Sequence, residues 1–128
     1  AALGCGLDTF AGIDLAALRQ KSMTLGDLMI RLVAQECGGF GLSLASPAEG
    51  SRRGSQVSYA HPHGYAVMQA LIARRVIGDF RAPDLLRFGF TPLYLRYQDI
   101  WDAVSILKIV LTQEEWRRPE FNVRAAVT

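Results

Sequence analysis

Residues 76–94 read VIGDFRAPDLLRFGFTPLY, and this stretch decides how the domain is built. Residues 76–80 and 85–90 are mainly apolar and are separated by turn-forming residues at 81–83. We therefore expect two strands with a tight turn between them. Within the second strand, the alternation of side chains places its phenylalanines on one face and Arg87 on the other.

Arg87 is the most informative polar residue of this stretch. A guanidinium inside an apolar strand is costly unless it meets an anion. It can pair with a carboxylate of the protein, for which Asp79 and Asp84 are available, or it can present its planar fork to an anionic ligand. From the residues alone, pairing within the protein is favoured, and ligand binding is the alternative.

The remaining elements follow from apolar periodicity on either side of this stretch. Helices are expected at residues 13–37, 64–75 and 97–112, further strands at 41–46 and 56–60, and an extended tail at 113–128. The order helix, strand, strand, helix, strand, strand, helix predicts an α+β fold. We expect a two-layer sandwich in which a small, mostly antiparallel sheet carries helices on one face.

The composition is that of one folded domain covering residues 1–128. Half of the residues are hydrophobic, 20% are charged, and the net charge is +2 with acidic and basic residues interspersed. No basic stripe for nucleic acid and no membrane-spanning stretch are found. Cys5 and Cys37 lie in no metal-binding spacing, which suits a reducing cytoplasm. The first ten residues read as the continuation of a longer polypeptide.

Other polar residues give weaker signals for chemistry. His61 and His63 are two positions apart, but the proline between them and the lack of a third ligand favour a structural role, so no metal site is predicted. Ser55 follows a glycine, yet no histidine base is placed beside it by the sequence. No catalytic residue is therefore assigned.

Four segments together resemble a known family. They are GDFRAPDLLRFGFTPLY at 78–94, YQDIWDAV at 97–104, RRGSQVSYAHPHGYAV at 52–67 and FNVRAAVT at 121–128. The whole chain resembles the C-terminal small domain of bacterial kynureninases, which belong to the fold-type I enzymes that use pyridoxal phosphate. The family reaction cleaves L-kynurenine with water to anthranilate and L-alanine.

The resemblance implies a role for Arg87, which stands at the arginine of the family's RFGFTPLY motif. This arginine binds the α-carboxylate of the substrate, and a bidentate clamp there fixes the torsion of the reacting bond. Asp79 and Arg81 are expected to pair with each other and to shape the loop before Arg87.

The resemblance also implies that the cofactor is bound elsewhere. The family's Schiff-base lysine and cofactor-binding residues lie in a large upstream domain, and neither Lys21 nor Lys108 matches a family motif. The chain alone should therefore be inactive and bind no pyridoxal phosphate. We expect residues 1–37 to form a long helix that links it to the large domain, within a cytoplasmic homodimer.

Two alternatives stay open at this point. The domain could be a stand-alone amino-acid-binding or regulatory module, or it could belong to another fold-type I enzyme such as a cysteine desulfurase. A linking helix should carry exposed apolar surface when the domain is isolated, whereas a free-standing module should cover it.

Overall fold

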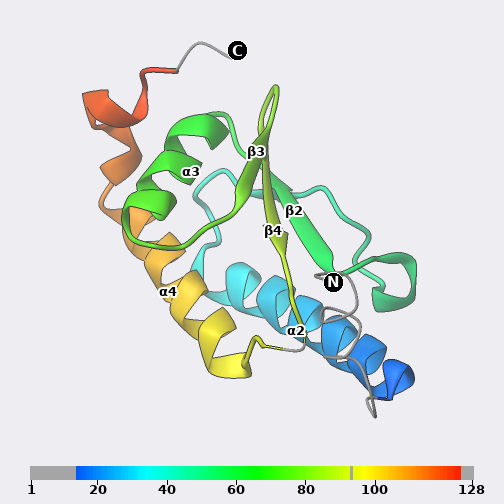
Figure 1. Ribbon diagram of the computed structural model, residues 1–128. Coiled ribbons are helices and arrows are strands. Elements are labelled where there is room, and N and C mark those ends of the chain that lie inside the picture. Colours follow the sequence, from blue (N-terminus) through cyan, green and yellow to red (C-terminus); the bar gives the residue numbers. More distant parts are fainter. Residues whose placement is uncertain (1–13, 93, 125–128) are drawn as a thin grey trace, which may run out of the picture.

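The computed structural model describes residues 14–92 and 94–124 and contains one antiparallel sheet (Figure 1). The sheet has the order β1-β2-β4-β3, and all three neighbouring pairs are antiparallel. Its strands are β1 (Ser43–Leu44), β2 (Gln56–Ala60), β3 (Asp79–Arg81) and β4 (Leu85–Gly89). The longest strands, β2 and β4, pair at the centre although the helix α3 and the strand β3 separate them in sequence.

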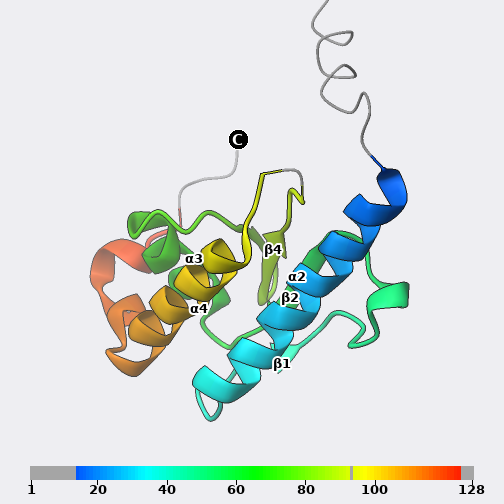
Figure 2. The same ribbon diagram turned by 90° about the horizontal axis from the view of Figure 1, so that it is seen from below.

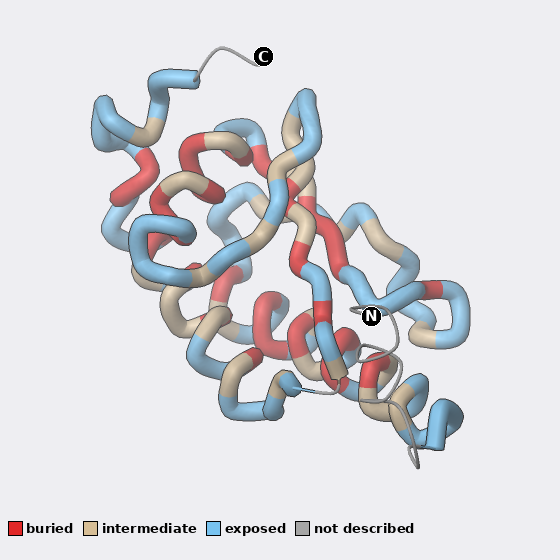
Figure 3. The backbone as a smooth tube through the Cα atoms, viewed as in Figure 1, coloured by how far each residue is buried: buried red, intermediate tan, exposed pale blue. Residues whose placement is uncertain are grey.

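The helices form the second layer. They are α2 (Leu15–Glu36), α3 (Gly64–Ala73) and α4 (Tyr97–Thr112), and Figure 2 shows them on one side of the sheet. The core lies between the two layers, where the buried segments gather in Figure 3. Val57 and Tyr59 of β2 and Leu86 and Phe88 of β4 point into it. The predicted α+β two-layer fold is confirmed.

The first helix begins as its sequence indicates. Asp14 is the N-cap, and its Oδ1 accepts hydrogen bonds from the backbone N–H groups of Ala16 and Ala17 at 2.9 and 3.4 Å. The helix ends at Glu36, one residue before the predicted end. The part of the predicted helix at residues 1–13 lies outside the described residues.

Two strand predictions need correction. The strand expected at 41–46 pairs only at Ser43–Leu44, and the strand expected at 76–80 is instead Asp79–Arg81, so Arg81 ends a strand and is not a turn residue. The second shift has a physical cause at the end of α3. Arg75 adopts the left-handed region with φ 68°, and the backbone N–H of Val76 still donates to Leu71. The chain is therefore free to pair only after Gly78.

The tail prediction is also wrong over the described part. Two 3₁₀ turns, η2 (Glu115–Arg117) and η3 (Pro119–Phe121), replace the extended segment, and Trp116 is buried. The ring of His63 stacks on Trp116 with centroids 4.3 Å apart, which fastens this end of the chain to the start of α3. No helix in the described ranges is both long and apolar enough to cross a membrane.

Candidate functional site

A row of polar residues crosses the sheet on the face that the helices leave open. Arg87 of β4 stands opposite Ser58 of β2 on one side and opposite Asp79 of β3 on the other. Because side chains alternate along a strand, these residues point away from the face that carries the buried Leu86 and Phe88. The predicted orientation of Arg87, away from the phenylalanines, is confirmed.

Arg87 is held on one side only. Its Nη2 donates a hydrogen bond to Oδ2 of Asp79, and its side chain is 29% exposed. Its Nε is buried and has no hydrogen-bond partner among the residues that the structure describes. A buried donor without an acceptor is uncommon. Among the described residues no acceptor is found for Nη1 either, so this side of the guanidinium retains donor capacity for an anion.

Asp79 joins the two arginines. Its Oδ2 also accepts a hydrogen bond from Nε of Arg81 at 3.3 Å, as expected from the sequence. The hydrogen bond from Arg87 is the main cause that lowers the pKa of the Asp79 carboxyl, and the positive charge of both arginines acts in the same direction. The three side chains together carry one excess positive charge, which matches a ligand with a single carboxylate.

Arg87 and Asp79 line an open depression of about 370 Å³ at the end of β4. Gln56 of β2 stands opposite Gly89 of β4, and both contribute to the lining. The remaining walls come from Ser55, Ile77, Gly78, Phe90 and Thr91. Arg87 is thus paired with a carboxylate of the protein and also lies at the edge of an open depression.

Gly78 packs closely against both β4, the strand that carries Arg87, and helix α3. A Cβ at Gly78 would lie 2.8 Å from the backbone oxygen of Arg87 and 2.7 Å from Cε of Met68 on α3. Only a residue without a side chain allows this approach. Gly78 directly precedes Asp79, so this close packing also fixes the position of the Asp79 backbone from which the carboxylate extends.

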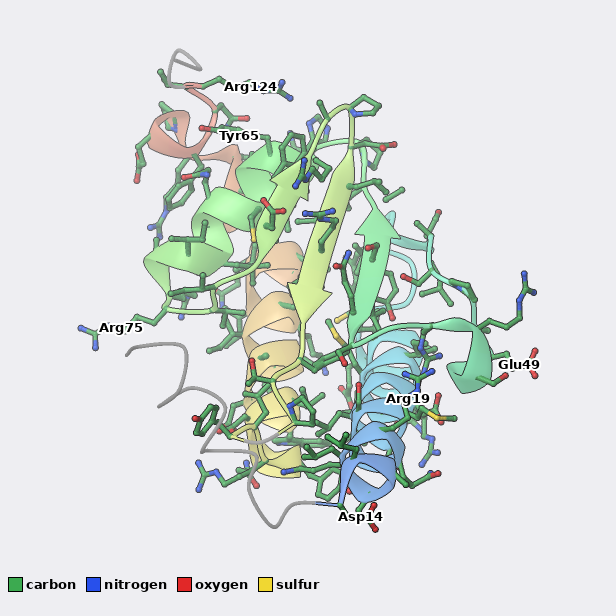
Figure 4. The ribbon with its side chains drawn as sticks, turned by 45° about the vertical axis from the view of Figure 1, so that its right-hand side comes forward. Asp14, Arg19, Glu49, Tyr65, Arg75 and Arg124 are labelled. Atoms are coloured by element: carbon green, nitrogen blue, oxygen red, sulfur yellow. The ribbon has the colours of Figure 1, made fainter. Side chains whose placement is uncertain are left out.

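Arg53 anchors the loop that leads into β2. Its buried guanidinium donates to Oδ1 of Asp27 on α2 at 2.6 Å and to the backbone oxygen of Ala48 at 2.7 Å. Arg19 of α2 adds a hydrogen bond to the backbone oxygen of Arg53 at 2.6 Å. In Figure 4, Arg19 points toward the loop that carries Glu49. These contacts position the start of β2, where Ser55 and Gln56 line the depression.

An apolar groove continues from the depression. A cavity of about 340 Å³ between α4 and the ends of β3 and β4 shares the lining residues Ile77, Gly89 and Phe90 with it. Large apolar side chains around this end of the domain are exposed: Ile77, Tyr94, Tyr97 and Trp101. On α2, by contrast, Leu15 is the large hydrophobic residue that is exposed. Four of the eight large hydrophobic residues that are exposed in the described ranges therefore lie at this end of the domain, and one, Leu15, lies on α2.

The lysines of the chain lie away from this depression. The chain has two lysines. Lys108 of α4 pairs with Glu36 of α2 at 2.8 Å, and Lys21 lies on α2, so both belong to the helix layer and neither lines the depression on the opposite face. No cluster of three metal-binding side chains occurs in residues 14–92 and 94–124.

His61 has a structural arrangement. Its Nδ1 accepts from the backbone N–H of His63 at 2.9 Å, so its Nε2 carries the proton that it donates to the backbone oxygen of Phe40 at 2.9 Å. Burial lowers the pKa of the imidazole. The ring joins the end of β2 to the loop after α2, which agrees with the structural reading of this histidine.

The sequence reasoning missed Gln56 and the buried role of Arg53. The strand pattern at 56–60 places Gln56 on the open face, but only the pairing of β2 with β4 brings it beside Arg87. Arg53 donates four hydrogen bonds to two separate segments, helix α2 and the loop at 47–48, which no local pattern reveals.

Comparison with known sequences identifies the family of the chain. The family described as Kynureninase C-terminal domain matches residues 18–107. Proteins named Kynureninase from Burkholderia mallei (strain SAVP1) and Burkholderia pseudomallei (strain K96243) are each 58% identical over 124 residues, which is 97% of this chain and 30% of theirs. The Kynureninase of Pseudomonas fluorescens is 54% identical over the same share. The chain thus spans about 30% of the length of these relatives.

Proposed function

Since this chain belongs to the kynureninase family as its C-terminal domain, we propose that Arg87 binds the α-carboxylate of L-kynurenine in the complete enzyme. The enzyme cleaves its substrate with water to anthranilate and L-alanine. The family match favours this assignment over a cysteine desulfurase and over a stand-alone module.

One observation carries the proposal. Arg87 lies at the edge of an open depression and is 29% exposed; Asp79 occupies its Nη2, and no acceptor for its Nη1 is found among the described residues. An arginine needed only for structure would be expected to use its donors within the protein. Here part of the fork is held in place and part is left for a carboxylate, whose planar shape it matches.

Asp79 and Arg81 position this arginine. The Asp79 carboxylate accepts from both guanidinium groups and so limits the rotation of Arg87. A side chain fixed before the ligand arrives loses less conformational entropy on binding. The substrate carboxylate would then be held in one orientation, which limits how the groups bonded to Cα can be oriented in the site.

The rest of the enzyme supplies what this domain lacks. We place the pyridoxal phosphate and its lysine in the large upstream domain, because Lys21 and Lys108 lie away from the depression. The domain alone is then inactive. The exposed apolar residues beside the depression, such as Ile77 and Trp101, would be covered by the large domain or by a second subunit of a homodimer. A cytoplasmic location suits this metabolic role.

Substitution of Arg87 in the complete enzyme tests the proposal. Loss of a hydrogen-bonded charge pair is worth about 1.5–3 kcal/mol, so Arg87→Ala should lower kcat/KM for L-kynurenine about tenfold to a hundredfold and leave the cofactor absorbance intact. Arg31→Ala, an exposed arginine on α2, is the matched control. Equal activity of the two variants would overturn the proposal, and loss of cofactor absorbance would assign Arg87 to cofactor binding instead.

A further inference from the structure

We propose that Gln56 is a second binding residue for the ligand carboxylate and acts beside Arg87. This inference rests on the proposed function, because it takes the depression to be the carboxylate site. Gln56 lies on the central strand β2, on the face that the helices leave open. It lines the same depression as Arg87, as does Gly89.

Strand pairing puts the two side chains on either side of an open space. Gln56 stands directly opposite Gly89, and Arg87 lies two residues before Gly89 on the same face of β4. Gln56 and Arg87 are therefore diagonal neighbours, typically about 7–8 Å apart, and their long side chains can reach a shared partner. A carboxylate that accepts a hydrogen bond of about 2.9 Å from each side fits between such donors.

Gly89 provides the floor of this space. A Cβ added at Gly89 would meet no heavy atom within 4 Å, so the volume above it is not filled by the protein. Along β4, the cation of Arg87 is thus followed on the same face by the position of Gly89, which has no side chain. The amide of Gln56 stands opposite Gly89 on β2. This is the arrangement needed to bind an anion against the sheet.

Gln56 has hydrogen-bonding capacity left for a ligand. Its Nε2 donates to Oγ of Ser58 at 3.2 Å, which orients the amide along the strand toward the polar row. The amide nitrogen has a second N–H, and within the described residues this second donor is not engaged. Ser58 is itself buried and stands opposite Arg87, so it links the positions of the two binding groups.

The start of β2 is rigid enough to place this amide. Oγ of Ser55 accepts from Oγ of Ser22 on α2 at 2.8 Å, and the backbone oxygen of Ser55 accepts from the N–H of Phe90 at 2.8 Å. The residue before Gln56 is thus fixed to both layers of the domain. A binding group on such a support needs little reorganisation.

Equilibrium binding of L-alanine and L-alaninamide to the complete enzyme tests the inference, because the amide lacks the carboxylate. One hydrogen bond to a charged group predicts that Gln56→Ala weakens L-alanine binding about tenfold. Gln56→Glu should weaken it more by charge repulsion, and neither variant should change the binding of L-alaninamide. Gln113→Ala, at an exposed glutamine after α4, is the matched control.

The outcomes separate the two proposals. If Arg87→Ala weakens L-alanine binding and Gln56→Ala does not, the role of Gln56 is wrong and that of Arg87 stands. If neither variant affects L-alanine relative to the control, the carboxylate site itself is wrong. If Gln56→Ala weakens both ligands equally, the residue supports the fold of the site and does not bind the carboxylate.

Discussion

Arg87 and Asp79 stand directly opposite each other on paired strands, and the arginine donates a hydrogen bond to the carboxylate across the sheet. The pair lies at the edge of the depression and not in the core. An ion pair in this position stabilises the fold little, because its members are partly exposed to solvent. Its main effect is to restrict where the guanidinium points.

Asp79→Asn should therefore affect substrate binding more than stability. The neutral amide no longer holds Arg87 by charge, and we expect the KM for L-kynurenine to rise severalfold with a smaller change in kcat. In an Arg87→Ala background the same substitution should have no further effect, since there is no arginine to position. Additive effects of the two substitutions would contradict the positioning role, and Asp102→Asn on α4 serves as the control.

Gly78→Ala should destabilise the domain. The new methyl group would meet the backbone oxygen of Arg87 at 2.8 Å, and backbone in a paired strand cannot move aside as a flexible side chain can. Overpacking of this kind costs about 1–3 kcal/mol in the free energy of unfolding. Urea denaturation measures it, with Gly54→Ala as the control because a Cβ there meets nothing within 4 Å. Equal stability of the two variants would contradict the close packing.

The stability of the domain should fall as the pH drops below 6.5, the ordinary pKa of histidine. Burial lowers the pKa of His61 in the folded domain, so the unfolded chain takes up the proton first and acid favours unfolding. The loss should continue until the pH reaches the lowered pKa and then level off for this group. His61→Asn should remove this part of the pH dependence below pH 6.5. An unchanged slope in that variant would contradict the prediction.

Cys37 should be nearly inert in the folded protein. Burial is the main cause that raises the pKa of its thiol to about 11, from an ordinary value of 9.0. At pH 8 the reactive thiolate is then roughly a hundredfold rarer than in an exposed cysteine. Alkylation, followed on the peptide that contains Cys37, should be slow under native conditions and fast in urea. Rapid native labelling would show that the side chain is accessible.

Local patterns predicted the parts of the fold that depend on local sequence. The strand at 56–60 and the helix at 97–112 were predicted with their observed bounds, and alternation correctly oriented Arg87. The shift of β3 depends on the left-handed Arg75 and on contact between Gly78 and a strand later in the chain. The periodicity of apolar residues reveals neither a left-handed backbone conformation nor a contact between separate segments.

The same distinction applies to the site. The sequence indicated Arg87, with Asp79 as a possible partner, because both are charged residues within a mainly apolar stretch. Gln56 has none, and its position beside Arg87 follows only from the pairing of β2 with β4. The tail was misjudged for a similar reason, since the stacking of Trp116 on His63 joins residues far apart in the sequence.

Arg53 links the segment before β2, which borders the depression, to helix α2 through hydrogen bonds. Its guanidinium bonds to Met23 and Asp27 of α2 and to Pro47 and Ala48 of the loop, all at 3.3 Å or less. The helix and the loop therefore shift as one body, and the beginning of β2 shifts with them. The positions of Ser55 and Gln56, which line the depression, therefore depend on the position of α2 through this one arginine.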